Sequence, residues 1–307
     1  MKTAKLDYPV HTLDNRLLLP AGKELTSEVL DELIAANKDT SYQALSFLEY
    51  GTVYQDILRL LQKPPYCVIF DELKSKIVLN LMKKINFIPP VLESLKYFKE
   101  NDFYTYRHTL MVFAMSTIMA RDLLEKSEDW LTEAMAGTIH DYGKICIPLQ
   151  ILNKSDSLTR TDRSILEHHA LAGFVLLSYL LKDHRSFAAR VAKEHHERRD
   201  GSGYPLAISL RDKMVEIIAV CDVYDALLSP RPYRPIPYDN RTALEEIIEM
   251  AQGGKLSWDV VKTLVSHNRK DRPHFRECKV STEKRGIPPA DNLYGVIADE
   301  DADNNRG

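Results

Sequence analysis

The stretch WLTEAMAGTIHDYGK, residues 130–144, decides how the rest of the chain is interpreted. Its apolar residues recur at helical spacing and lead into an adjacent histidine and aspartate, His140 and Asp141. Neighbouring side chains point about 100° apart on a helix, so both could reach a centre that holds two ions, with the Asp141 carboxylate free to bridge them. Lys144 follows one turn later. The stretch therefore predicts a buried helix that ends in a metal-binding motif.

Further histidines fall on predicted helices at positions that can join this centre. His108 lies on a helix expected over 104–124, on the side that also carries three methionines. Standing alone, His108 would be explained more simply as a hydrogen-bonded core histidine. His195 and His196 end another predicted helix, and two adjacent imidazoles suit two adjacent metal ions. The glycine-rich loop 201–205 follows them. A tight turn without a role in binding would explain its composition as well.

A capping box at residues 159–162, Thr-Arg-Thr-Asp, predicts the start of a further helix. His169 falls on the apolar stripe of that helix and faces inward. His168 does not, and it is expected to be solvated or to support the ligands from outside. Gly173, one turn after His169, would permit the close approach of another backbone.

Carboxylates on an apolar stripe are the least expected feature for a purely structural protein. On the helix predicted over 215–228, Asp222 and Asp225 fall on such a stripe. A carboxylate on a buried face is costly unless it is paired or bound to a cation. For Asp225, a salt bridge to Arg231 or Lys144 explains the burial as well as metal ligation does.

These segments bring nitrogen and oxygen donors, and no thiolates, to one interior. That donor set favours iron, manganese or zinc over calcium, magnesium or copper(I). A purely structural role would leave many inward ligand-type side chains unexplained. We expect two divalent metal ions, iron first, with manganese or zinc as alternatives. The predicted ligands are His108, His140, Asp141, His169, His195, His196 and Asp222.

Composition narrows the class of protein. The chain has 307 residues, 44% of them apolar, which is enough for a substantial core. A net charge of −3 gives no basic excess, so we expect no extended contact with a nucleic-acid duplex, while a small anionic ligand is compatible. The four cysteines are far apart and predict no disulfide framework. No signal peptide is evident, and the most apolar run, 110–120, is too short to cross a bilayer, so we expect a cytoplasmic protein away from membranes.

Helical periodicity dominates the chain, which predicts a mainly α fold. We expect an all-helical C-terminal bundle and a smaller, mostly helical N-terminal domain with a few short strands. Pro89 and Pro90 place the boundary near residue 88, because residues before prolines leave the helical region and Pro90 suits a helix start. The N-terminal domain over 1–88 has no assigned role, and regulation through a protein partner is one possibility.

Three segments refine this organisation. Within the N-terminal domain, residues 66–70 are expected to form a short strand and 71–85 a helix. The bundle is expected over 89–285. A tail over 286–307 is expected to be partly disordered, since 299–305 is too acidic and polar to bury.

With these residues in hand, the chain resembles the HD-GYP family of cyclic di-GMP phosphodiesterases, a subset of the HD-domain metal-dependent phosphohydrolases. The resemblance covers about 90–270 and rests on motifs in the family's order. These are His140-Asp141-x-Gly143-Lys144, Ile151-Leu152-Asn153-Lys154, His169-x-x-x-Gly173, His195-His196-Glu197-x-x-Asp200-Gly201-Ser202-Gly203-Tyr204-Pro205, Asp222-Val223-Tyr224-Asp225-Ala226-Leu227 and Arg231-Pro232-Tyr233-Arg234.

The resemblance implies hydrolysis of cyclic di-GMP to linear pGpG, to GMP, or to both at a two-metal site. Asp141 would bridge the ions and Lys144 would lie beside the scissile phosphate, which makes both of them candidate catalytic residues. The other implied roles are ligand contact for Lys144, Arg231 and Arg234, the characteristic loop for Gly203, Tyr204 and Pro205, and support of the ligands from outside for Asp200 and Asp225.

Three positions depart from the family's pattern. Some members hold a third metal through a carboxylate one turn before the first histidine, where this chain has Tyr104, so two metals are expected. Tyr142 replaces an aliphatic residue and Ser155-Asp156 replaces Pro-Gly, which bears on substrate fit and turnover. One alternative is therefore a cyclic di-GMP sensor that keeps the metal site without efficient turnover. Another is an HD phosphohydrolase that acts on a mononucleotide or an alarmone.

Overall fold

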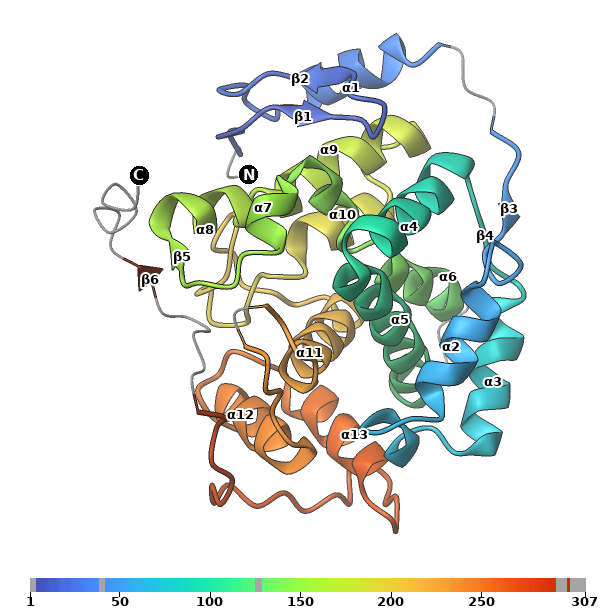
Figure 1. The fold of residues 1–307 in the computed structure, drawn as a ribbon, viewed down its shortest axis with the longest axis vertical. Coiled ribbons are helices and arrows are strands. Elements are labelled where there is room, and N and C mark those ends of the chain that lie inside the picture. Colours follow the sequence, from blue (N-terminus) through green and yellow to red (C-terminus); the bar gives the residue numbers. More distant parts are fainter. Residues whose placement is uncertain (1–3, 39–41, 125–128, 233, 291–296, 299–307) are drawn as a thin grey trace.

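The chain forms a helical bundle with a few very short strands (Figure 1). The computed structural model describes residues 4–38, 42–124, 129–232, 234–290 and 297–298. Ahead of residue 89 the elements are β1 (Val10–His11), β2 (Leu17–Leu19), α1 (Ser27–Ala36), β3 (Leu45–Ser46), α2 (Val53–Leu61), η1 (Tyr66–Val68), α3 (Glu72–Met82) and β4 (Asn86–Phe87). From residue 89 onward they are α4 (Pro89–Asn101), α5 (Phe103–Leu124), α6 (Trp130–Ala134), η2 (Met135–Thr138), η3 (Tyr142–Cys146), α7 (Leu149–Leu152), β5 (Leu158–Thr159), α8 (Arg160–Glu167), α9 (His169–Leu181), α10 (Phe187–Glu194), α11 (Lys213–Leu228), α12 (Asn240–Gln252), α13 (Trp258–Asn268) and β6 (Ile297–Ala298). The predicted mainly α fold, with short strands in a smaller N-terminal part, is confirmed.

Side-chain caps set where several helices begin. Thr26 accepts a hydrogen bond from the backbone N–H of Val29 at the start of α1. At the start of α8, Thr159 and Asp162 form the predicted capping box, in which each side chain accepts from the other residue's backbone N–H. These caps satisfy N–H groups that have no partner within the helix.

Strands pair only in twos among the described residues. β1 pairs with β2 and β3 with β4, both antiparallel, while β5 and β6 are parallel. The β3 and β4 pair ties together the two ends of the segment that holds α2, η1 and α3. The strand pairs therefore connect segments that lie between the helices, and the core itself is helical.

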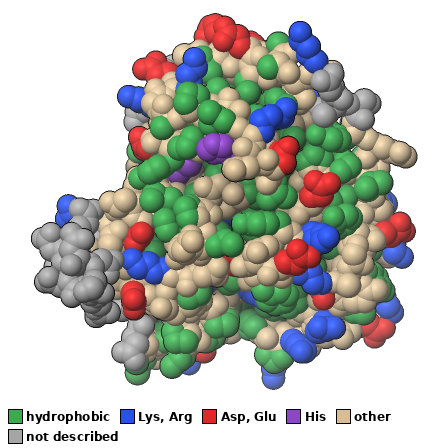
Figure 2. All heavy atoms as spheres, turned by 45° about the horizontal axis from the view of Figure 1, so that its top comes forward, with side chains coloured by type: hydrophobic (Ala, Val, Ile, Leu, Met, Phe, Trp, Pro, Cys, Tyr) green, Lys and Arg blue, Asp and Glu red, His purple; other side chains and the backbone are tan. Residues whose placement is uncertain are grey.

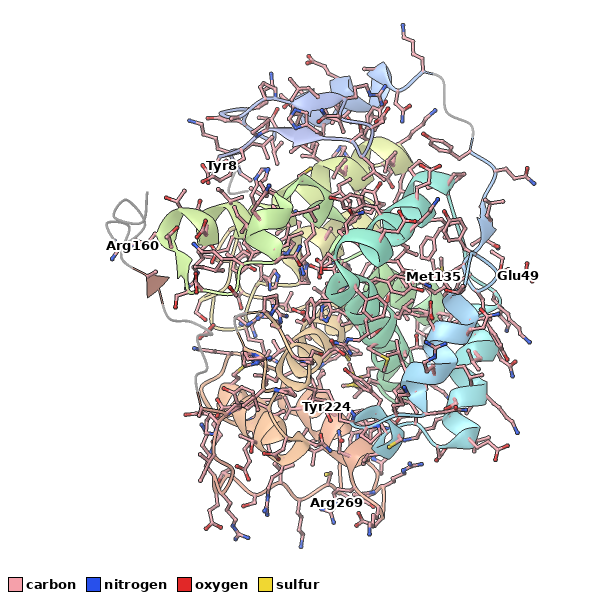
Figure 3. The ribbon with its side chains drawn as sticks, in the orientation of Figure 1. Tyr8, Glu49, Met135, Arg160, Tyr224 and Arg269 are labelled. Carbon is pink, nitrogen blue, oxygen red and sulfur yellow. The ribbon has the colours of Figure 1, made fainter. Side chains whose placement is uncertain are left out.

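Three helices form the centre of the core because they are apolar on nearly every face. α5 is buried from His108 to Ala120, α9 from His169 to Leu180 and α11 from Met214 to Asp222. α5 packs along α11, and α9 packs against α10 and η3. Figure 3 shows side chains filling the space between these helices, with Tyr224 lying between α11 and α13. Polar residues on these three helices are thus carried into the interior.

One helical segment, Arg160–Leu181, is long and apolar enough by composition to cross a membrane. It comprises α8 and α9. Of its most apolar window, 72% is buried inside the protein. Its apolar character is therefore accounted for by its place in the core.

The elements ahead of residue 89 pack directly on the bundle (Figure 1). α1 and β1 lie against α9, and α2 and α3 lie against α5. The ring of Phe47 meets the ring of Phe113 on α5 edge to face, at 5.9 Å between centroids. Apolar side chains from both sides of residue 88 therefore share one core.

Two predicted elements are wrong. Residues 66–70 form no strand: Tyr66–Val68 is the 3-10 helix η1, because the N–H groups of Ile69 and Phe70 both bond to the Tyr66 carbonyl instead of a neighbouring strand. The helix over 130–144 ends at Ala134 and continues as η2 and η3. Gly137 lies so close to α5 that an added Cβ would sit 2.8 Å from Ser116 Oγ, and this tight contact accompanies the tighter turn. The acidic stretch 299–305 lies outside the described residues.

Candidate metal centre

The seven predicted ligands converge at one place in the core. Asp141, His169, His195 and His196 offer ligand atoms that all lie within 4.8 Å of one another. His108, His140 and Asp222 form a second group by the same measure. All are buried except His196, which is partly exposed. The structure thus brings together side chains from α5, the η2–η3 turn, α9, the end of α10 and α11.

The carboxylate of Asp141 faces both groups, one oxygen toward each. Oδ1 lies 3.4 Å from Nε2 of His169 and 3.8 Å from Nε2 of His195. Oδ2 lies 3.4 Å from Nε2 of His140 and 3.6 Å from Nε2 of His108. Two ligands of one ion, each about 2.0–2.2 Å from it at angles near 90–110°, lie about 3.0–3.5 Å apart. Asp141 is therefore placed to contribute to two ion positions.

Distances within each group fit shared ions equally well. Nε2 of His108 lies 3.1 Å from Oδ1 of Asp222 and 3.3 Å from Nε2 of His140. In the other group, Nε2 of His169 lies 3.3 Å from that of His195 and 3.1 Å from that of His196.

The contacts of Nδ1, the ring nitrogen that faces away from the centre, show why Nε2 is an acceptor in three of these histidines. Nδ1 of His140 lies 2.8 Å from the Gly137 carbonyl oxygen, and Nδ1 of His169 lies 2.5 Å from that of Leu166. Nδ1 of His195 lies 3.0 Å from the Val191 carbonyl. A carbonyl can only accept, so the ring proton is on Nδ1 and the lone pair of Nε2 points into the centre. Several lone pairs and two carboxylates directed at one another need a cation between them, so this donor set fits bound metal.

The electrostatics of the site favour the neutral ligand form of His169, His195 and His196. Burial lowers the pKa of His169 to about 4 and that of His195 to about 3, which keeps both imidazoles neutral at pH 7. Burial and the neighbouring His195 also hold the pKa of His196 well below its usual value. Burial opposes protonation of His108 too, but the neighbouring Asp222 and Asp225 raise its pKa.

The two carboxylates stay ionised. Burial alone would raise the pKa of Asp141, but Lys144 and His140 hold it well below its usual range. Burial opposes ionisation of Asp222 in the same way, but the neighbouring His108, His196 and His140 together hold its pKa well below its usual range. Neutral imidazoles and charged carboxylates are the forms that bind a divalent cation.

Close backbone packing holds the centre together. A Cβ on Gly143 would lie 2.0 Å from the carbonyl oxygen of His169 and 2.4 Å from the backbone nitrogen of Gly173. Only glycine fits there, and the predicted close approach of another backbone at Gly173 is found. The contact joins η3, which follows Asp141, directly to the first turn of α9.

His140 and Asp141 reach the centre from a turn and not from the predicted 130–144 helix. They lie in the turn between η2 and η3, where the backbone of Asp141 has φ −94° and ψ 10°. The 100° offset of a regular helix therefore does not apply. Hydrogen bonding of His140 to Gly137 and close packing of Gly143 fix their directions instead.

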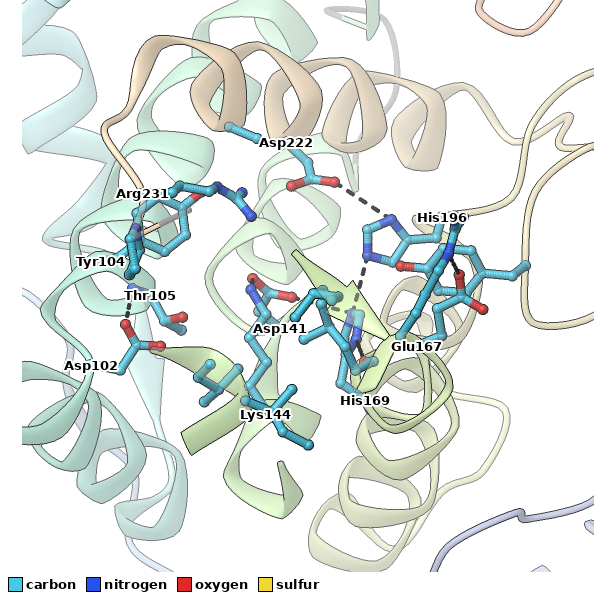
Figure 4. Close-up of a pocket in the computed structure, with 18 of the residues that line it drawn as sticks. Asp102, Tyr104, Thr105, Asp141, Lys144, Glu167, His169, His196, Asp222 and Arg231 are labelled. Atoms are coloured by element: carbon cyan, nitrogen blue, oxygen red, sulfur yellow. Dashed lines mark hydrogen bonds and ion pairs between the residues drawn. The ribbon is translucent and has the colours of Figure 1, made fainter. Parts of the chain in front are cut away.

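A pocket opens above the centre (Figure 4). Lys144 extends along it with Nζ 2.6 Å from Oδ2 of Asp141. Arg231 lies over the ring of Tyr104, 4.3 Å from its centroid, donates to the Tyr104 hydroxyl and points toward Asp222. The other walls come from Asp102, Thr105, Ile151, Leu152, Ser157, Leu158, Arg163, Leu166, Glu167, Arg198, Tyr204, Val223, Ala226 and Pro232. The pocket thus offers cations beside the candidate metal ligands.

Tyr104 occupies the position one turn before His108. Its ring stacks on the His108 imidazole, with 5.5 Å between centroids and an interplanar angle of 16°. An aromatic ring, with the Arg231 guanidinium on it, thus fills the place where a carboxylate would supply a further metal ligand.

The Gly-Tyr-Pro loop packs onto His196. The Tyr204 ring stacks on the imidazole, with 4.5 Å between centroids and 22° between planes. A Cβ on Gly203 would lie 2.3 Å from the His196 carbonyl oxygen, so this loop also depends on glycine. The fully buried carboxylate of Glu197 accepts N–H bonds from Leu206 and Ile208, at 2.7 and 3.0 Å. Sequence reasoning gave Glu197 no role, although a carboxylate directly after two ligand-type histidines was a signal.

Two predicted residues do not reach the pocket. Arg234 is 1% exposed and donates to the carbonyls of Ala226, Leu227 and Ser229 at the end of α11. Those carbonyls lack helical partners, and the guanidinium satisfies them, so the expected ligand contact is wrong. Asp200 accepts hydrogen bonds from Ser202 in the exposed loop and does not support the ligands.

His168 faces away from the cluster, as expected, but it is not solvated. Only 6% of it is exposed, and its ring lies edge to face with Tyr8, 5.5 Å between centroids. The N-terminal segment covers it, which the periodicity of its own helix could not reveal.

Asp225 pairs with Arg107 at 2.7 Å, and not with Arg231 or Lys144. Its Oδ2 also lies 2.7 Å from Nδ1 of His108. The salt-bridge explanation of its burial was correct in kind, but the partner was missed. Asp225 thus contacts the candidate ligand His108 on the side of the ring that faces away from the other candidate ligands.

The surface shows charges of both signs. On the face drawn in Figure 2, lysine and arginine side chains alternate with aspartate and glutamate, and no continuous basic area covers it. This face is not suited to an extended phosphate backbone.

Comparisons with known proteins agree with this geometry. The family model described as HD domain matches residues 96–256. A cyclic di-GMP phosphodiesterase of Pseudomonas aeruginosa is 39% identical over 152 residues, 48% of this chain and 36% of that protein. A cyclic di-GMP phosphodiesterase of Thermotoga maritima is 36% identical over 201 residues, 63% of this chain and 53% of that protein. A 3′3′-cGAMP-specific phosphodiesterase of Vibrio cholerae is 33% identical over 146 residues, 47% of this chain and 31% of that protein. The chain spans between about a third and about half of these curated relatives.

Proposed function

The chain belongs to the HD domain family, in its HD-GYP branch, and from that premise we propose that it is a metal-dependent phosphodiesterase that hydrolyses cyclic di-GMP. One observation carries the proposal: each oxygen of Asp141 faces a separate group of imidazoles at the floor of a pocket. A carboxylate between two such groups is suited to a binuclear centre. We propose two divalent ions, iron first, with manganese or zinc as alternatives.

The proposed ions would be held by two sets of side chains that share Asp141. One set is His169, His195 and His196, and the other is His108, His140 and Asp222. When bound, two divalent cations neutralise charge on a phosphodiester and lower the pKa of water that attacks it.

The chain's own residues bind and orient the substrate. Lys144 is 9% exposed and reaches the pocket beside Asp141, so it would donate to a phosphoryl oxygen as negative charge develops there. Arg231, held on the Tyr104 ring, would contact a phosphate or a guanine edge by charge-assisted hydrogen bonds. Tyr204, stacked on His196, would bound the far side of the ligand.

The proposed products are linear pGpG, GMP, or both. The Vibrio cholerae relatives named as specific for 3′3′-cGAMP make that dinucleotide a substrate to test beside cyclic di-GMP. Both are cyclic dinucleotides with two bridging phosphates, so the same cations would recognise them.

We propose the domain organisation that the sequence predicts, with a boundary near residue 88. Residues 1–88 would regulate the HD-GYP region over 89–285, with a protein partner as one source of input, and 286–307 would be a tail. α4 begins at Pro89, which supports a boundary there. The cytoplasm is the proposed compartment.

The test is metal analysis combined with turnover. The protein is purified without oxygen, its iron, manganese and zinc are measured, and it is incubated with cyclic di-GMP or 3′3′-cGAMP while products are separated by chromatography. Two ions and a linear or mononucleotide product support the proposal. Tight dinucleotide binding without product would make the protein a sensor, and a protein without bound metal would overturn the proposal.

Adjacent histidines provide a matched pair of variants. His169→Gln removes a predicted ligand, so metal content should fall and turnover should be lost. His168→Gln changes the neighbouring buried histidine, which faces away from the centre, and it should retain both metals. Equal metal content in the two variants would contradict the assigned ligand set.

A further inference from the structure

The carboxylate of Asp225 is fully buried behind the metal centre, and side chains from several segments contact it. Oδ2 lies 2.7 Å from Nδ1 of His108 and 2.7 Å from Nη2 of Arg107. An ionised carboxylate only accepts, so His108 donates from Nδ1 and directs the Nε2 lone pair toward Asp222 and His140. A shift of Asp225 would therefore turn the His108 ring.

The other oxygen of this carboxylate is held from outside the matched HD region. Tyr66, which precedes residue 89, donates from its hydroxyl to Oδ1 of Asp225. The same hydroxyl accepts a 2.6 Å hydrogen bond from Nη1 of Arg107. Tyr66 is 3% exposed, so bulk water does not compete for this contact. The family model begins at residue 96, so a contact from Tyr66 is not part of what it matches.

The position of that hydroxyl depends on the N-terminal part of the chain. Tyr66 begins η1, and its backbone N–H bonds to the Lys63 carbonyl at 3.0 Å. Arg272, just beyond α13, pairs with Asp71, which caps α3. The Asp71–Arg272 pair thus fastens the segment that carries Tyr66 to the residues after α13, and a movement of this segment would be felt at Asp225.

Charge and direction are supplied by different neighbours of Asp225. Arg107 brings the positive charge that balances the carboxylate. Tyr66 is neutral, and its hydroxyl adds a directed hydrogen bond at the oxygen farther from His108. Its removal therefore leaves the charge balance intact while releasing one constraint on the carboxylate's rotation.

We propose that Tyr66 is a positioning residue of the metal centre, which fixes His108 through Asp225 and makes residues 1–88 part of that centre. The inference rests on the proposed metal site. Through this contact, the N-terminal part can affect the reaction, because displacement of η1 from α11 would loosen one metal ligand.

The test compares two tyrosine variants in the full-length chain. Tyr66→Phe removes only the hydroxyl on Asp225. Tyr106→Phe is the matched control, because Tyr106 is also buried and donates to a carboxylate, Asp56, at 2.9 Å, with no contact to Asp225. Affinity for each ion is measured by competition with a chelating dye, and the cobalt-substituted proteins are compared by absorption spectroscopy.

We expect Tyr66→Phe to weaken the binding of one of the two ions by up to about 10-fold and to alter the cobalt spectrum. Loss of the group that contacts a ligand directly costs about 10–100-fold, and Tyr66 acts one contact further out. Tyr106→Phe should match the wild type in both readouts. Equal affinities for Tyr66→Phe and Tyr106→Phe would overturn the inference. A wild-type protein that binds no metal would instead overturn the proposed function, so the two failures are distinguishable.

A second variant covers the case in which Tyr66→Phe fails to fold. Ser229 directly follows α11, and its Oγ lies 2.6 Å from the Asp225 backbone carbonyl oxygen and 3.2 Å from Oδ2 of the same residue, while it accepts a hydrogen bond from Arg107. Ser229→Ala therefore loosens the same carboxylate without touching the N-terminal part. It should weaken the same ion in the same direction, and wild-type affinities in this variant would overturn the proposed route through Asp225.

Discussion

Replacing Gly143 with alanine should separate two halves of the metal centre. The added Cβ would lie 2.0 Å from the His169 carbonyl oxygen, and real Cβ atoms essentially never approach closer than 3.0 Å. The atom that must move is backbone, which cannot rotate aside as a long side chain would. η3 and α9 must therefore move apart by 3.0 − 2.0, or about 1.0 Å.

That movement can be followed to the ligands. Oδ1 of Asp141 and Nε2 of His169 are 3.4 Å apart, and an added 1.0 Å would place them about 4.4 Å apart. Neighbouring ligands of one ion usually lie about 3.0–3.5 Å apart, and about 4.4 Å also exceeds the 3.8 Å between Asp141 and His195, so Asp141 and His169 should hold a shared ion much more weakly. The overpacking should also cost about 3 kcal/mol or more of stability.

Two measurements check this reasoning. Metal content by mass spectrometry should fall from two ions to one in Gly143→Ala, and thermal unfolding should begin at least about 6 °C lower, at about 2 °C per kcal/mol. Gly253→Ala is the control, since φ there is −72° and the nearest atom to the new Cβ is 3.5 Å away. It should behave as wild type. A Gly143→Ala protein with two ions and an unfolding temperature within about 2 °C of wild type would refute the argument.

Acidification should destabilise the metal-free protein between pH 6.5 and about 4. The pKa values of His169 and His195 in the folded protein, about 4 and 3, lie below the value of 6.5 in the unfolded chain. The unfolded chain therefore binds more protons than the folded protein in this pH range. Urea unfolding from pH 7.0 to 4.5 should show up to about 1.4 kcal/mol lost per pH unit for each histidine. Lys144→Met should lower kcat by about 10²–10³ with metal content unchanged. Arg234→Ala should lose about 2–4 kcal/mol in urea unfolding because it removes the guanidinium donor of the Ala226 and Ser229 carbonyls at the end of α11. Arg231→Ala should mainly raise KM, and its stability should change by less than about 1 kcal/mol.

Each of these expectations has a contrary result. A stability that does not change from pH 7.0 to 4.5 would mean that the buried histidines are not held neutral. Loss of metal from Lys144→Met would show that the effect on kcat comes through Asp141 and the bound metal, and would remove the support for a direct contact with the substrate. A fully stable Arg234→Ala protein would remove its role at the end of α11, and an unchanged KM in Arg231→Ala would remove Arg231 from the ligand contacts.

Helical phase was sufficient to select His108, His169 and Asp222, because each lies on a regular helix whose apolar face is continuous. It failed at His140 and Asp141, where η2 and η3 replace the predicted helix. The two residues still reach the centre there, but through close backbone packing that periodicity does not describe. Residue type was thus predictable where local geometry was not.

Contacts between distant segments account for the other errors. His168 lies off the apolar stripe of its own helix, yet Tyr8 covers it from far along the chain. Arg107 and Tyr66 reach Asp225 across 118 and 159 positions, and no local pattern signals such pairs. Arg234 has the residue type expected of a phosphate contact, but a long side chain can also fold back onto nearby carbonyls, and the end of α11 offers three. A motif specifies the residue, and the fold decides where its charge is placed.

The candidate ligands also run across a long stretch of chain, and this gives the metal a second role. An ion held by His108 and Asp222 closes a loop of 222 − 108, or 114, residues. A permanent cross-link over a loop of that length stabilises a protein by about 5 kcal/mol through the entropy of the unfolded chain. A metal cross-link is reversible, and its contribution rises with the logarithm of free metal concentration. Metal scarcity would then expose the opened chain to proteases, so the amount of this protein in a cell, and not only its activity, should follow the metal supply.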